Sequence, residues 1–166
     1  ILSVYVETSI ISHLVSRPSV NLVTQSMQQI IQHWWKHERH NYRLAISTLV
    51  REEISRGDPI ASAKRLQAIQ GIEVLEINRE IRNLADMLVK KNMLPSKSKD
   101  DAIHIAATSF YGIDCLLTYN CKHISNINTI PQIQDTIKSA GYRCPIITLP
   151  QNLISISKDF YEKPKT

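Results

Sequence analysis

The sequence is poor in glycine and cysteine. Four glycines occur in 166 residues, and none forms a G-x-G-x-x-G motif. A dinucleotide-binding domain is therefore not expected, because such domains need this glycine-rich turn to let the backbone approach a pyrophosphate closely. The three cysteines, Cys115, Cys121 and Cys144, are odd in number and lack C-x-x-C spacing. This pattern argues against a disulfide framework and a zinc site, and it predicts reduced thiols.

Long apolar runs and internal divisions are also missing. No stretch approaches the roughly 20 apolar residues that span a bilayer, and no charged-then-apolar signal opens the chain. No repeat, low-complexity segment or flexible linker divides the sequence. We therefore expect a cytoplasmic protein without a membrane segment, with one folded domain over residues 1–150 and a C-terminal tail over 151–166.

The charge balance is mildly basic. Lysine and arginine outnumber aspartate and glutamate by 20 to 15, which gives a formal net charge of +5. Ordinary solubility charge explains an excess of this size. Positive charge around an acidic pocket would equally hold a polyanion. Composition alone leaves both interpretations open.

Short apolar segments alternate with helical ones. Strands are expected at 2–6, 43–46, 73–77, 115–118 and 146–149, and helices at 8–15, 21–40, 48–57, 58–71, 78–91, 100–111 and 130–140. Thr8 and Ser9 are the expected caps of the first helix. The alternation predicts a three-layer α/β/α sandwich around a mostly parallel sheet of about five strands.

Acids and one amide stand where the predicted strands end or the helices begin. They are Glu7, Glu52, Glu53, Asp100, Asp101 and Asn120. In an open parallel sheet these positions meet at one crevice. Carboxylates that lie close together need a cation or shifted pKa values, and oxygen ligands are those that hard divalent cations prefer. The pattern therefore predicts a divalent-metal site.

Four stretches carry a family resemblance. In order and spacing, VYVETSIIS, STLVREEIS, KSKDDAIHIAA and LLTYNCKHISN resemble the motifs of PIN domains, a metal-dependent ribonuclease fold, and most closely those of VapC-type toxins of toxin-antitoxin pairs. The resemblance runs from Leu2 to about Leu149. It implies that the protein has a PIN-like fold and hydrolyses RNA with Mg²⁺ or Mn²⁺. It also implies that the protein forms a homodimer and binds a small antitoxin.

The resemblance also selects residues within the stretches. It matches Glu53 to the family's second acid and Asp101 to the third, so Glu7, Glu53 and Asp101 are expected to bind the metal. The carbonyl oxygen of Asn120 is expected to bind the cation or position water. The residues expected around these four are Thr8, Asp100, His104, Thr118 and His123.

Two departures from the family pattern leave an alternative. Glu7 stands where most PIN domains have aspartate, and Asn120 stands where many have a fourth acid. A catalytically weakened PIN scaffold, which binds RNA or a protein partner without cleavage, fits both substitutions. The site residues also have structural explanations, since Glu7 would cap the next helix and acids are favoured in a first helical turn. The structural explanation for His104 is a hydrogen-bonded position in the core.

Other chemistry-bearing residues are assigned to structure. Glu52 is expected to form a surface ion pair with Arg56. His33, His37 and His40 recur at spacings of four and three, but nothing else in the sequence closes a metal site around them. Trp34 and Trp35 are expected to pack against the domain or a partner, and an exposed one would favour a dimer.

Overall fold

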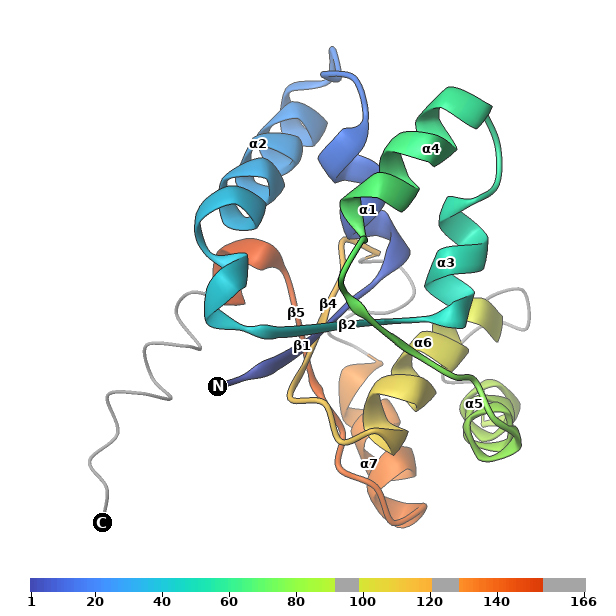
Figure 1. The fold of residues 1–166 in the computed structure, drawn as a ribbon. Helices are drawn as coiled ribbons and strands as arrows, with labels where there is room; N and C mark the ends of the chain where they lie inside the picture. Colours follow the sequence, from blue (N-terminus) through green and yellow to red (C-terminus); the bar gives the residue numbers. More distant parts are fainter. Residues whose placement is uncertain (92–98, 121–128, 154–166) are drawn as a thin grey trace.

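A five-stranded sheet lies at the centre of the computed structural model, which describes residues 1–91, 99–120 and 129–153 (Figure 1). The strands are β1 (Ser3–Val6), β2 (Arg43–Ser47), β3 (Glu73–Leu75), β4 (Cys115–Leu117) and β5 (Ile146–Thr148). Every neighbouring pair is parallel. The mostly parallel sheet expected from the sequence is confirmed.

Helices cover both faces of the sheet (Figure 1). One face carries α1 (Thr8–Val15), α2 (Leu22–His37), α3 (Thr48–Ile54) and α4 (Pro59–Ala68), with the short helix η1 (Arg39–Asn41) before β2. The other face carries α5 (Arg79–Lys90), α6 (Lys99–Phe110) and α7 (Ile130–Ser139). Within these layers α1 touches α2, α3 and α4, and α5 touches α6 and α7. The three-layer sandwich is therefore confirmed.

Helix ends differ from the expected positions mainly at the last turn. The structure ends α3 at Ile54 and α4 at Ala68, each three residues before the glycine that was expected to close it. Gly57 and Gly71 follow with φ of 86° and 80°. These glycines therefore act in the turns after the helices, where a positive φ is needed, rather than as the last helical residues.

The strand order creates a switch point beside β1. The order is β3-β2-β1-β4-β5, so the chain winds away from β1 on one side and then continues on its other side. In parallel sheets a crevice opens at the carboxyl ends of the strands where the winding reverses. Val6 is paired with Leu117 across this point. The residues that follow, Glu7 and Thr118, therefore leave the sheet side by side.

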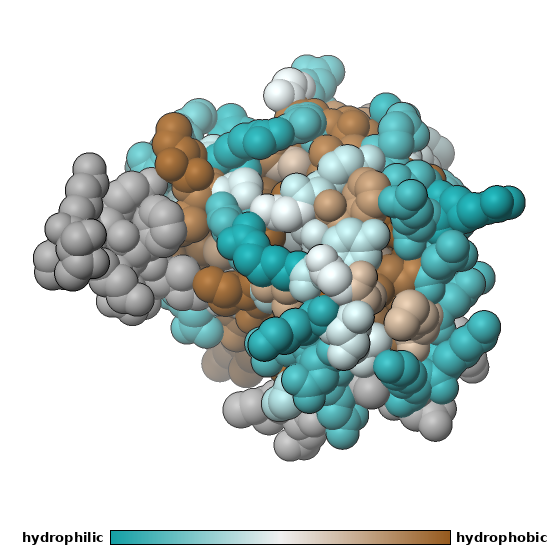
Figure 2. Space-filling view, turned by 90° about the horizontal axis from the view of Figure 1, so that it is seen from below, coloured by the Kyte–Doolittle hydropathy of each residue, from teal (hydrophilic) through white to brown (hydrophobic). Residues whose placement is uncertain are grey.

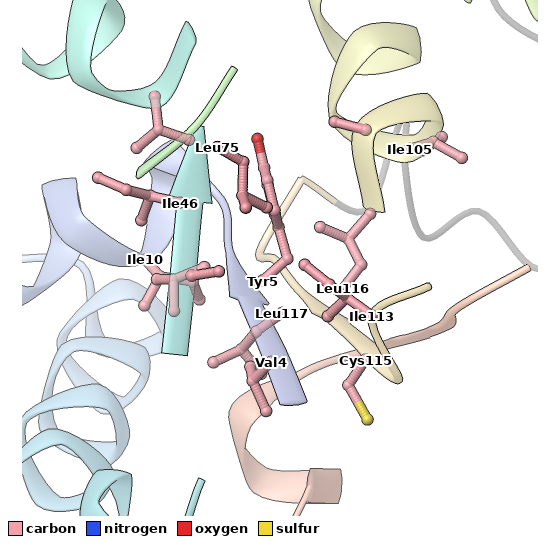
Figure 3. Close-up of a cluster of buried hydrophobic side chains, with 14 of the residues drawn as sticks. Val4, Tyr5, Ile10, Ile46, Leu75, Ile105, Ile113, Cys115, Leu116 and Leu117 are labelled. Carbon is pink, nitrogen blue, oxygen red and sulfur yellow. The ribbon is translucent and has the colours of Figure 1, made fainter. Parts of the chain in front are cut away.

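The core is built on the central strands (Figure 3). Their fully buried residues are Val4, Tyr5, Val6, Cys115, Leu116 and Leu117. Ile10 of α1 and Ile105 of α6, from opposite layers, are buried equally. Each such apolar side chain contributes about 1.5–3 kcal/mol when it leaves water. Leu153 also belongs to the core, and the expected tail lies, from residue 154 onward, outside the described residues.

The two tryptophans of α2 have different surroundings. Trp34 is 1% exposed, and its ring centroid lies 5.7 Å from that of Tyr42. Trp35 is half-buried, with the guanidinium of Arg39 4.8 Å from its ring centroid. Trp34 is therefore a core residue and cannot be the exposed tryptophan considered for a dimer.

The surface differs between the two layers. Figure 2 views the molecule from the side of α7, where hydrophilic residues cover much of the face and hydrophobic ones lie in small groups between them. Highly exposed hydrophobic residues occur on the opposite layer, before and in the first turns of α2 and α4: Val20, Leu22, Val23 and Ile60. None of the helices within the described ranges has the length and apolar character needed to cross a bilayer.

Candidate functional site

Glu7 lies directly after β1 at the switch point. Its backbone N–H donates to the Leu117 carbonyl at 3.0 Å, which extends the pairing of β1 with β4 by one residue. Its side chain is 5% exposed, and Oε2 accepts hydrogen bonds from the Ser9 N–H at 3.0 Å, the Ser9 hydroxyl, and the Thr118 hydroxyl at 2.9 Å. Glu7 is therefore the N-cap of α1. The expectation that Thr8 or Ser9 caps this helix is wrong, because the hydroxyls of both residues donate to carboxylates instead.

Glu53 is brought to the same region by α3, which follows β2 directly. Its Oε1 accepts hydrogen bonds from the Thr8 hydroxyl and from His104 Nε2, both at 2.7 Å. The adjacent Glu52 is exposed and forms an ion pair with Arg56 at 2.9 Å, as expected. Consecutive helical residues point about 100° apart. Of these two acids, Glu53 is therefore the one that faces the switch point.

Asp101 and Asn120 come from the beginning of α6 and the segment after β4. Asn120 Nδ2 donates to Asp101 Oδ1 at 3.0 Å, and the Asn120 backbone N–H donates to the Thr118 hydroxyl at 2.9 Å. Thr118 also contacts Glu7, so these residues form one hydrogen-bonded group. Asp100 is exposed in the same first turn as Asp101.

His104 connects the site to the interior of the protein. It is fully buried on α6, one turn beyond Asp101. Its Nε2 contacts Glu53, and its Nδ1 lies 2.7 Å from the Tyr5 hydroxyl. His104 is therefore a buried core residue that also forms a hydrogen bond with Glu53, one of the expected metal ligands. His123, which was also expected near the metal, lies outside the described residues.

His104 and Glu53 each favour the charged form of the other. Burial alone lowers the pKa of His104, but the hydrogen bond to Glu53 and the negative charges of Glu7, Glu53 and Asp101 raise it above its ordinary value. Burial alone raises the pKa of Glu53, but the hydrogen bonds from His104 and Thr8 and the charge of His104 hold it below its ordinary value. The negative charges of all three expected ligands therefore favour the protonated form of His104.

The sequence interpretation missed three contributors to this network: Tyr5, Ser9 and Ser47. Tyr5 was read only as a strand residue, although a tyrosine inside a doubly covered strand needs a partner for its hydroxyl. Ser9 was expected only as a cap. Ser47 caps α3, with its Oγ 3.4 Å from the Val50 N–H, but the same oxygen also contacts Tyr5.

The carboxylate oxygens of Glu7 and Glu53 are the type of ligand that hard cations bind. The hydrogen bonds described for Glu7 all reach Oε2, and those described for Glu53 all reach Oε1. Protein donors commonly hold one side of a metal-binding carboxylate in this way. Oxygen ligands of this kind fit Mg²⁺ or Mn²⁺. Within residues 1–91, 99–120 and 129–153, no three His, Cys, Asp or Glu side chains are arranged to hold an ion as they stand, so sharing one requires side-chain movement.

Comparison of the sequence with models of protein families and with curated proteins finds no match. Among solved structures, the chain is similar to VapC20 of Mycobacterium tuberculosis, a sarcin-ricin loop cleaving toxin, with a TM-score of 0.54 and 17% identity over 69% of this chain and 87% of that chain. At 17% identity, this structural similarity shows a shared fold and nothing more. Together with the five-stranded parallel sheet, the similarity identifies the fold of this chain as that of a PIN domain.

Proposed function

We propose that the chain is a divalent-metal-dependent endoribonuclease, which hydrolyses RNA phosphodiester bonds as the toxin of a toxin-antitoxin pair. The observation that carries this proposal is the gathering of Glu7, Glu53, Asp101 and Asn120 from four separate segments. All four belong to hydrogen-bonded groups at the switch point of a PIN fold. A structural explanation for each residue taken singly does not account for their meeting at one place.

The proposed metal ligands are Glu7, Glu53 and Asp101, with Mg²⁺ or Mn²⁺ as the ion. When bound, such a cation supplies water activation and charge neutralisation at the scissile phosphate. The hydroxyls of Thr8 and Thr118 hold the two glutamates in place. His104 is fully buried, so we assign it to positioning Glu53 rather than to proton exchange with substrate.

Cleavage assays on neighbouring acids test this proposal. VapC20 is a sarcin-ricin loop cleaving toxin, so an RNA stem-loop of that kind is a suitable first substrate. We expect cleavage with Mg²⁺ or Mn²⁺, none with EDTA, and a loss of at least about 100-fold in Glu53→Gln. Glu52→Gln is the matched control, because it removes the same charge one residue away on the exposed side of α3. Equal activity of both variants would refute the site.

The catalytically weakened scaffold predicts a different result. Its basis is the pair of departures at Glu7 and Asn120. In that case the RNA would bind with and without metal but remain intact, and Glu53→Gln would bind it as well as the parent protein. Measuring binding and cleavage on the same RNA therefore separates the two functions.

We also propose a homodimer and a small antitoxin partner. The support is the group of exposed apolar side chains on the layer of α1 to α4: Val20, Leu22, Val23 and Ile60. Exposed apolar side chains that lie together on a surface commonly mark contact sites. Light scattering at increasing protein concentration, followed by purification from the native host, tests both partners. A concentrated monomer recovered without a bound small protein would refute both.

A further inference from the structure

A chain of hydrogen bonds runs from the sheet to Glu53. The Tyr5 hydroxyl lies 2.7 Å from Ser47 Oγ and 2.7 Å from His104 Nδ1, and His104 Nε2 lies 2.7 Å from Glu53 Oε1. Tyr5, Ser47 and His104 are all 0% exposed. Figure 3 shows the Tyr5 side chain reaching from β1 into the space between Leu75 and α6, with its hydroxyl oxygen at the far end. Water therefore cannot easily replace either partner of this hydroxyl.

The chemistry of the partners determines which atoms donate. An ionised Glu53 only accepts hydrogen bonds, so His104 Nε2 must carry a proton. In the neutral imidazole, Nδ1 is then an acceptor, and the Tyr5 hydroxyl is the donor that satisfies it. In the charged imidazole, Nδ1 donates to Tyr5 Oη, which in turn donates to Ser47. The Tyr5 hydroxyl suits both states, and in both Nε2 donates to Glu53.

We propose that Tyr5 is a positioning residue that keeps His104 as a hydrogen-bond donor to Glu53 and thereby orients Glu53 for metal binding. This inference rests on the proposed function, because it takes Glu53 as a metal ligand. Glu53 Oε1 is held by His104 and by Thr8, so Oε2 is the oxygen that would be available to bind an ion. An ordinary packing role for Tyr5 would need its ring but not its hydroxyl.

Tyr5→Phe separates the ring from the hydroxyl. We expect the variant to bind Mn²⁺ about 10–100-fold more weakly than the parent, in line with the loss of other groups that orient metal ligands. Calorimetric titration of Mn²⁺ and the Mn²⁺-induced rise in Tm measure the change without any RNA. Unchanged affinity in a folded Tyr5→Phe protein would overturn the proposal.

Ser109→Ala is the matched control. Ser109 is 2% exposed, lies on the same helix as His104, and donates its hydroxyl to the Ile105 carbonyl at 2.9 Å. Its removal also costs one buried hydrogen bond, but it does not interrupt the connection between Tyr5 and Glu53. We expect Ser109→Ala to lower Tm in EDTA while binding Mn²⁺ like the parent. An equal loss of Mn²⁺ affinity in both variants would assign the effect to general destabilisation and refute positioning.

The protonated nitrogen of His104 can be observed directly in the parent protein. Nitrogen-15 chemical shifts of the imidazole, measured without metal, distinguish a proton on Nε2 from one on Nδ1. We expect Nε2 to be protonated in the parent protein. A neutral His104 with its proton on Nδ1 would overturn the proposal even if Tyr5→Phe failed to fold.

The outcomes also separate this inference from the ribonuclease function. If the parent protein binds Mn²⁺ more tightly than Tyr5→Phe but cuts no RNA, positioning stands and the ribonuclease proposal fails. If the parent cuts RNA with Mn²⁺ and Tyr5→Phe binds the ion equally well, positioning fails and the ribonuclease proposal stands. A parent protein that binds no Mn²⁺ would refute both.

Discussion

Asn120 donates its side-chain N–H to Asp101 Oδ1 at 3.0 Å. A carboxylate at position 120 would offer only oxygens to this neighbour, whereas the amide offers a donor. The hydrogen bond therefore stabilises the charge of Asp101 before any cation arrives. Asn120 makes the metal-free site less crowded with negative charge, and it reduces the attraction that the site has for an ion.

Asn120→Asp should exchange stability for metal affinity. The substitution replaces an attractive hydrogen bond with two carboxylates in contact, so we expect a lower Tm in EDTA than for the parent protein. The added charge should tighten Mn²⁺ binding and enlarge the Mn²⁺-induced rise in Tm. Melting curves with EDTA and with graded Mn²⁺ measure both effects. A variant with the parent's Tm under all conditions would show that residue 120 does not act on the ion.

Asp101→Asn should remove function without unfolding the protein. If Asp101 only stabilised the first turn of α6, losing its charge would cost about 0.3–1 kcal/mol of dipole interaction. We expect cleavage and the Mn²⁺-induced rise in Tm to disappear as well. Asp100→Asn is the control, because Asp100 is an exposed acid in the same helical turn. If the two variants behave alike in cleavage assays, Asp101 is not a metal ligand.

Asp114 should make stability depend on pH at the other end of the sheet. It accepts hydrogen bonds from the Ser3 N–H at 2.9 Å, the Ser3 hydroxyl at 3.0 Å and Arg143 Nη2 at 3.1 Å. Burial opposes its ionisation, but these partners outweigh burial and hold the pKa of Asp114 below its ordinary value. Its contribution to stability is therefore present above the unfolded-state pKa and is lost as pH falls through the lower folded-state pKa.

Urea unfolding of Asp114→Asn tests this pH dependence. At pH 7 we expect the variant to lose about 0.5–1.5 kcal/mol of unfolding free energy relative to the parent. The difference should shrink as the pH is lowered below about 3.9, the ordinary aspartate value, because the parent carboxyl then becomes protonated. A difference that stays constant down to pH 2 would contradict the assigned cause.

Cys115 and Cys144 should react slowly with alkylating reagents in the folded protein. Burial raises the pKa of both thiols to about 11, and the charge of Asp114 adds to the effect at Cys115. Because the thiolate is the reactive form, little of it is present at pH 8. Labelling followed by mass spectrometry, with and without urea, measures the difference. Rapid labelling of Cys115 without urea would indicate that β4 opens readily.

The fold could be predicted because its signals are local. Alternating apolar strands and capped helices determine the layers, and right-handed crossovers restrict the order of the strands. The preference for Glu53 over Glu52 came from the family motif, which lies within one short segment. These signals need no knowledge of distant contacts.

The connections inside the site could not be predicted, because they join residues far apart in the sequence. The contact between Tyr5 and His104 spans 99 positions, and the contact between Thr8 and Glu53 spans 45. Glu7 illustrates the same limit, because the sequence indicates a helix cap at this position but not that the capping oxygen also accepts the Thr118 hydroxyl, 111 positions away.

Because Glu7 caps α1, the stability of the first turn of this helix depends on a residue of the candidate site. The oxygen that accepts the Ser9 N–H also accepts the Thr118 hydroxyl, so turning this carboxylate toward a ligand would loosen the first turn of α1 and its link to the end of β4. Three helices of one layer pack against α1. Amide hydrogen exchange in the first turn of α1 would therefore report a change in the orientation of the Glu7 carboxylate.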